Sequence, residues 1–108
     1  DLVVGRREAP SVPTQALFML NSRLVSDHAQ IMARRLAKER DDERQRITRA
    51  YLLTLGREPA AVEVDEALEF VAQFQAESEV MDDKSKEQDA WAAFCQTLFA
   101  SSEFRFLR

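Results

Sequence analysis

The sequence predicts an all-α fold, a compact bundle of four to five helices arranged as antiparallel helical hairpins. Three observations predict it. The 108-residue chain contains only two Gly and three Pro, the residues that most often interrupt or end helices. Hydrophobic residues make up 45% of the chain and charged residues 31%, which is enough apolar material for one core and a charged surface. Apolar residues also recur at helical spacing along most of the chain, which indicates amphipathic helices.

The first dozen residues differ from the rest. Gly5 and Pro10 fall in a stretch without sustained periodicity, so we expect residues 1–12 to be an extended lead-in. Residues 13–108 are expected to form a single helical domain. Pro13 has the fixed φ that suits a first helical turn, and the apolar run after it predicts a short, buried helix that ends near Asn21.

Two further helices follow, on either side of a short Asp-Asp link. The first is expected over residues 23–39, with Val25, Ala29, Met32 and Leu36 on one stripe and with Leu24, His28 and Ile31 widening it. An aspartate such as Asp42 can cap the next helix, which should end at Gly56 because glycine readily adopts the left-handed conformation that closes a helix. The short link between them predicts an antiparallel hairpin.

Two more helices are expected in the second half of the chain. After Pro59 an apolar stripe runs through Val64, Ala67, Leu68, Val71 and Phe74. The acidic residues 77–89 are expected to form a mobile loop, from which Ser85 and Gln88 start the last helix as a capping box. That helix carries Trp91, Phe94, Cys95 and Leu98, weakens at the serines that follow Ala100, and leaves a tail whose Phe104, Phe106 and Leu107 should close the core.

Composition excludes several classes of function. The net charge of −4 gives the whole domain no general attraction for nucleic acid or anionic lipid. No apolar run is long enough to span a bilayer, so we expect no membrane insertion. The chain opens at Asp1 without an initiator methionine, so we expect it to be the C-terminal fragment of a larger protein.

The residues that could carry chemistry favour no active site. Ser26, Asp27 and His28 are the residue types of a hydrolytic triad, but adjacent residues on one helix do not face one another. We therefore interpret His28 as a partly buried helix residue. Cys95 lies on an apolar stripe, where a thiol behaves as a small hydrophobe. One Cys and one His in distant segments make no transition-metal site, so we expect no catalytic residue, metal or cofactor in this fragment.

The clearest charge feature is a run of basic residues in the first half of the chain. We predict that Arg34, Arg35, Lys38, Arg46 and Arg49 bind a partner, either upstream domains of the parent chain or another protein. Arginine favours this interpretation because its guanidinium pairs with carboxylates in a bidentate manner. Intervening acidic residues and the lack of interleaved aromatic residues argue against nucleic acid. The oligomeric state is left open.

Three segments together resemble a known family. They are the run Val12-Pro13-Thr14-Gln15-Ala16-Leu17-Phe18 with Leu20-Asn21, then Arg49 to Pro59, then Trp91 to Phe104. They are similar to the C-terminal planctomycete-specific domain of large exported proteins, a domain of unknown function. Departures from the family pattern at Glu58 and Ala60, where a proline and a threonine are usual, concern the start of the helix that follows.

The resemblance implies an exported parent protein in the periplasm or cell envelope, often with a c-type cytochrome segment elsewhere in the same chain. The sequence therefore favours a non-catalytic helical interaction or structural module. The alternative is an enzyme whose active site is shared between this fragment and upstream domains, acting on polysaccharide in keeping with an envelope location.

Overall fold

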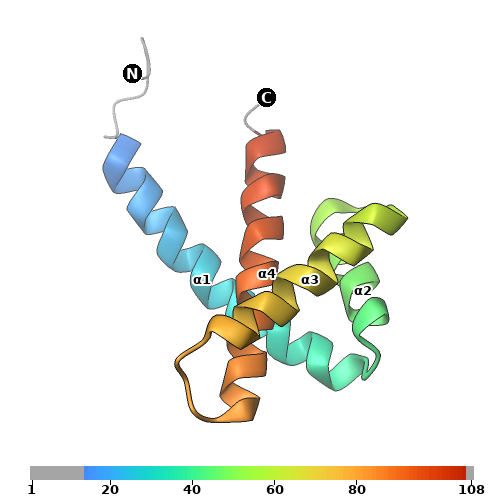
Figure 1. The fold of residues 1–108 in the computed structure, drawn as a ribbon. Coiled ribbons are helices and arrows are strands. Elements are labelled where there is room, and N and C mark those ends of the chain that lie inside the picture. The colour runs from blue at the N-terminus through green and yellow to red at the C-terminus, as the bar shows by residue number, and fades with distance from the viewer. Residues whose placement is uncertain (1–13, 107–108) are drawn as a thin grey trace.

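A computed structural model describes residues 14–106, and the side chains of residues 23–101. The described residues form four helices and no strand, which confirms the predicted all-α class (Figure 1). These helices are α1 (Thr14–Glu39), α2 (Glu43–Leu55), α3 (Ala61–Glu77) and α4 (Asp83–Phe106). The predicted lead-in, residues 1–12, lies outside the described residues, as does Leu107.

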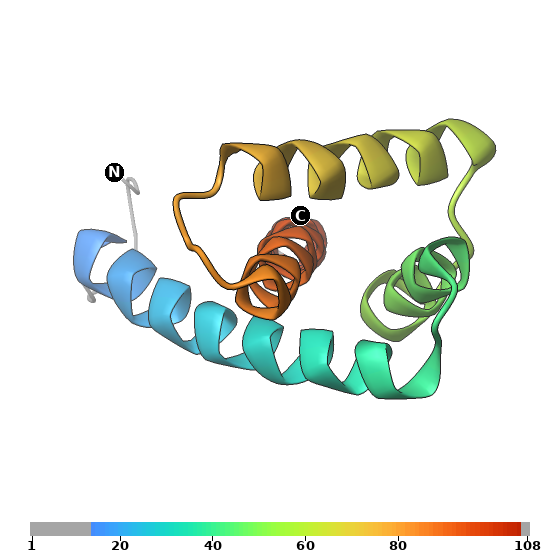
Figure 2. The same ribbon diagram turned by 60° about the horizontal axis from the view of Figure 1, so that its bottom comes forward.

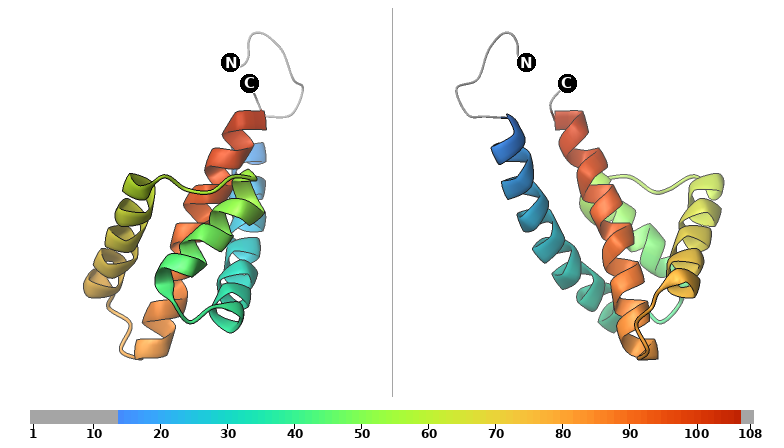
Figure 3. Two further views of the ribbon diagram at one scale, coloured as in Figure 1. Left: turned by 90° about the vertical axis from the view of Figure 1, so that its right-hand side faces the viewer. Right: turned by 60° about the vertical axis from the view of Figure 1, so that its left-hand side comes forward.

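The four helices alternate in direction along the chain (Figure 3). The last helix, α4, occupies the middle of the bundle, with α3 on one side of it and α1 on the other (Figure 2). Helix α2 lies against α1, α3 and α4. All three of the other helices lie against α4, whereas α1 and α3 share no close backbone contact among the described residues. The core is therefore built around α4, and α1 and α3 form opposite outer layers.

The buried residues of α4 are Ala90, Trp91, Ala92, Phe94, Cys95 and Leu98, all at most 5% exposed. The ring of Trp91 meets that of Phe94 edge to face, with the ring centroids 6.0 Å apart. Against α4 lie the buried residues of the other helices, which are Ala29, Ala33, Leu36, Ile47, Ala50, Tyr51, Val64, Ala67 and Val71. The predicted stripe of the last helix is confirmed.

The caps between α1 and α3 follow the predicted chemistry. Asp42 accepts a hydrogen bond from the backbone N–H of Gln45 at 3.0 Å, as an N-cap residue does. At the other end of α2, Gly56 has φ +72°, and its N–H donates to the carbonyls of Tyr51 and Leu52. Both ends of α2 are thus set by the residues that the sequence singles out.

Two predicted boundaries are wrong. The expected separate helices at residues 13–21 and 23–39 are one continuous helix, α1, because the segment between them holds neither Gly nor Pro to end it. The acidic loop is also shorter than residues 77–89. Asp82, not Ser85, caps α4, by accepting the N–H of Ser85 at 2.9 Å, and the helix begins at Asp83.

The side chain of Gln88 does not form the predicted capping box. It donates instead to the carbonyl oxygen and the side-chain oxygen of Gln30, at 3.1 and 2.9 Å, and so connects α4 to α1. At its other end, α4 continues past the serines after Ala100 to Phe106, so the helix does not end at the serines predicted to weaken it. The side chains of Phe104 and Phe106 lie outside the described residues.

Candidate functional site

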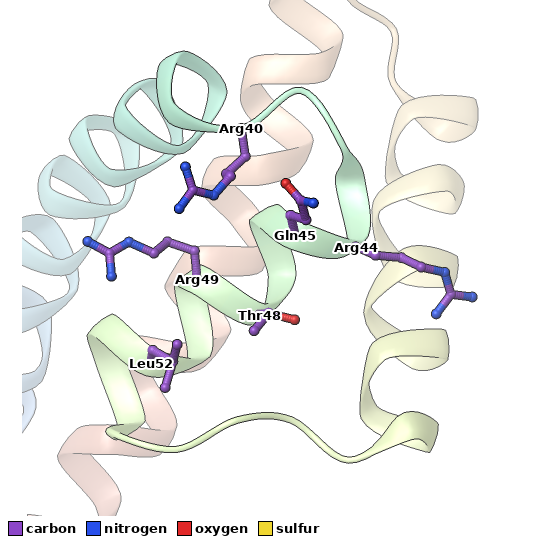
Figure 4. Close-up of a pocket in the computed structure, with 6 residues that line it drawn as sticks. All are labelled: Arg40, Arg44, Gln45, Thr48, Arg49 and Leu52. Carbon is purple, nitrogen blue, oxygen red and sulfur yellow. The ribbon is translucent and has the colours of Figure 1, made fainter.

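The C-terminal end of α1 and the outward face of α2 carry most of the arginines of the described chain. Two hollows lie there. One, of about 430 Å³, is lined by Ile31, Arg34, Arg35, Lys38 and Glu39. The other, of about 310 Å³, is lined by Arg40, Arg44, Gln45, Thr48, Arg49 and Leu52 (Figure 4). We call Arg34, Arg35, Lys38, Arg40 and Arg49 the basic surface.

Glu39 joins the two halves of the basic surface. Its carboxylate accepts a hydrogen bond from Arg35 at 2.9 Å within α1 and another from Arg49 at 3.3 Å across to α2. The Arg35 hydrogen bond, with Arg49 adding to it, lowers the pKa of the Glu39 carboxyl. One carboxylate therefore holds two guanidinium groups, and it keeps its own charge to a lower pH than an unpaired glutamate does.

The other three members of the basic surface retain unused hydrogen-bond donors. Arg34 and Lys38 are exposed and make no ion pair with another described residue. Arg40 donates one N–H to the carbonyl of Glu39 at 3.0 Å. Arg40 and Arg49 line the same hollow, whereas Arg44 points away from both toward α3 (Figure 4), where it pairs with Asp65 at 3.2 Å. The surface can therefore accept carboxylates or another anion.

Arg46, predicted to bind a partner, is only 8% exposed and is the one charged residue in the described core. Its Nε donates to the carbonyl of Arg40 at 2.6 Å, its Nη1 lies 3.4 Å from the Glu87 carboxylate, and its guanidinium sits 5.3 Å from the centre of the Trp91 ring. These contacts place Arg46 between α1, α2 and α4, away from the exposed surface. We therefore exclude Arg46 from the basic surface.

A second ionic cluster lies at the start of α3. Ala60, at the N-cap position, has no side-chain acceptor, and Glu63 accepts the Ala60 N–H at 2.8 Å instead. Both Glu63 oxygens also accept from Arg57, at 2.9 Å each. The Arg57 hydrogen bonds, with the Ala60 N–H, lower the pKa of Glu63 to about 2. Arg57 in turn lies 5.4 Å from the centre of the Tyr51 ring, so this cluster fixes the turn between α2 and α3.

The single histidine and the single cysteine lie on different helices, His28 on α1 and Cys95 on α4. His28 is exposed on α1, so the interpretation of it as partly buried is wrong. Cys95 is fully buried on α4, and burial raises the pKa of its thiol to about 12, which keeps it protonated and unreactive. Within residues 23–101, no three His, Cys, Asp or Glu side chains come together as a metal site would require. None of the helices in the described range is long and apolar enough to cross a membrane.

The fold and this surface define a small helical domain with an arginine-rich face. The model of one family, described as "PSD1: Protein of unknown function (DUF1553)", matches residues 1–71, about two thirds of the chain. The chain therefore belongs to that family. The matched region includes the whole basic surface and ends within α3. No curated protein and no solved structure matches the chain.

Proposed function

We propose that this domain is a non-catalytic helical interaction module, and that its basic surface binds an acidic surface on another domain or protein. The observation that carries the proposal is the pair Arg34 and Lys38. They lie one helical turn apart on α1, are exposed, and make no ion pair with another described residue. Arg35, Arg40 and Arg49 surround them with further donors for carboxylate oxygens.

The physical basis is that arginine side chains are well suited to such interfaces. A guanidinium is weakly hydrated and offers paired donors in the geometry of a carboxylate, so its desolvation at an interface is better compensated than that of an ammonium. Glu39 already holds Arg35 and Arg49 in place. Ordering them therefore reduces the side-chain entropy lost on binding.

We further propose, from the family resemblance, that the domain belongs to a larger exported protein of planctomycete type working in the periplasm or cell envelope. In this proposal any haem belongs to a c-type cytochrome segment elsewhere in the parent chain. The partner that we propose first is the upstream part of that parent.

A calorimetric titration of this domain against the separately expressed upstream remainder tests the proposal. Saturable binding is expected. The double variant Arg34→Glu with Lys38→Glu should weaken binding at least tenfold, because two favourable charge contacts become repulsive. The matched control is Lys84→Glu with Lys86→Glu on α4, which changes the net charge equally and alters no residue of the basic surface. Absence of binding, or equal weakening by the control, would refute the proposal.

A further inference from the structure

The outward face of α1 combines aliphatic and basic side chains. Leu24 and Ile31 are 53% and 55% exposed. They lie seven residues apart, and Lys38 follows after another seven, so the three share one stripe opposite the buried Ala29 and Leu36. From N- to C-terminus this stripe changes from apolar, at Leu24 and Ile31, to basic.

The outward face of α3 has the opposite charge. This helix contains five acidic residues and no Lys or Arg. Glu66 and Glu69 are exposed and form no ion pair with any described residue. Phe70 and Phe74 are each 38% exposed, with ring centroids 6.2 Å apart. The prediction that Phe74 lies in the core is wrong. From N- to C-terminus this helix carries Glu66 and Glu69, then Phe70 and Phe74, and it ends at Glu77.

The two faces are complementary in charge and in the order of their side chains. When the two helices run antiparallel, the aliphatic part of the α1 face comes opposite the aromatic part of the α3 face, and the basic end of α1 comes opposite the end of α3 that carries Glu66 and Glu69. One molecule cannot make this contact with itself, because α4 separates α1 from α3 and the two outward faces point to opposite sides (Figure 2).

From this complementarity we infer that the basic, aliphatic face of α1 docks on the acidic, aromatic face of α3 in a second copy of the chain. The inference rests on the proposed function, because it uses the same basic surface and names a second copy as its partner. The contact is head to tail, so each added copy leaves one α1 face and one α3 face free, and association is open-ended. A second copy satisfies both faces at once, whereas a partner with a single acidic surface leaves the α3 face uncovered.

Sedimentation velocity of the purified chain tests the inference. Low ionic strength should give a weight-average mass that rises with concentration above that of the monomer, and 0.5 M salt should reduce the association, because screening weakens contacts between exposed charges. The variant Ile31→Gln should also reduce association, since it removes apolar contact without changing charge. A monomer at millimolar concentration and low salt would overturn the inference.

A charge exchange makes the test specific to these two faces. The Arg34→Glu, Lys38→Glu variant carries acidic residues on both faces, and the Glu66→Lys, Glu69→Lys variant carries basic residues on both. Each should remain monomeric alone and helical by circular dichroism. An equimolar mixture should associate, because it joins an unaltered α1 face to an unaltered α3 face.

A mixture that stays monomeric would overturn self-association. Binding of the upstream remainder to the wild-type chain is measured separately, so the proposed function can survive that result. If the remainder fails to bind while the mixture associates, the outcome is reversed: the basic surface serves self-association and the first partner proposed is wrong.

Discussion

At the scale of single residues, Glu63 and Arg57 hold the start of α3, where Ala60 cannot act as a side-chain cap. Ala60 provides no side-chain acceptor for the first turn of α3, and Glu63 instead accepts the N–H of Ala60 itself while both of its oxygens bind Arg57. Glu58 and Ala60 depart from the pattern of the family that the sequence resembles, but α3 still begins directly after them. A carboxylate placed three residues into a helix is visible in the sequence, but its pairing with Arg57 depends on the turn between them.

Glu63→Gln is expected to lower the free energy of unfolding at pH 7 by about 0.5 to 1 kcal/mol, as for a partly exposed ion pair. The folded-state pKa of Glu63, about 2, lies below the ordinary glutamate value of 4.5. Its stabilising contribution is therefore complete above pH 4.5 and is lost as the pH falls toward 2. Urea denaturation across this range should show a smaller loss of stability in the variant. An unchanged pH profile would contradict the assignment.

At the scale of elements, the sequence predicts boundaries well where one residue decides them. Asp42, Gly56 and Pro59 mark their boundaries because caps and helix breakers act within a turn of the chain. Predictions fail where tertiary contacts decide. Phe74 and Ile31 fit the helical stripes, yet both are exposed because each outer helix is covered only on the side that meets the other helices. Arg46 is also buried for a tertiary reason, since its aromatic partner, Trp91, is distant in sequence.

Gly56 tests the closing of α2. Gly56→Ala should destabilise the domain by about 1 kcal/mol, because a left-handed conformation is unfavourable for a residue with Cβ. No atom lies within 4 Å of a Cβ built there, so the loss is one of backbone conformation and not of packing. Gly56→Asn is the control, and thermal unfolding should rank it between the wild type and alanine, since asparagine tolerates this conformation better. Equal melting temperatures would show that the turn has rearranged.

At the scale of the whole molecule, α4 is the element on which the other three depend. The sequence predicts the apolar stripe of this helix but not its central place, because that place follows from contacts between distant segments. The basic surface is likewise only partly predictable from the sequence. The arginine-rich composition predicts that such a surface exists, but only the fold shows that Glu39 joins its two halves and that Arg46 does not belong to it.

Trp91→Ala should therefore unfold the entire domain and not α4 alone. Replacing a buried tryptophan with alanine costs about 3 to 5 kcal/mol, a large part of the stability of a small domain. Trp91→Phe should be much milder, because an aromatic ring still lies beneath Arg46 and beside Phe94. It also removes the buried indole N–H, which has no described hydrogen-bond partner. Circular dichroism of both variants checks this. Wild-type helicity in the alanine variant would contradict the central role of Trp91.

The central position of the last helix also bears on how the chain acquires its structure during synthesis. A ribosome delivers α1, α2 and α3 before α4, so the apolar faces of three helices emerge before the helix that covers them. The contact of Gln88 with Gln30, for example, closes a loop of 58 residues. The newly made domain thus stays open to proteases and to chaperones until α4 has been made.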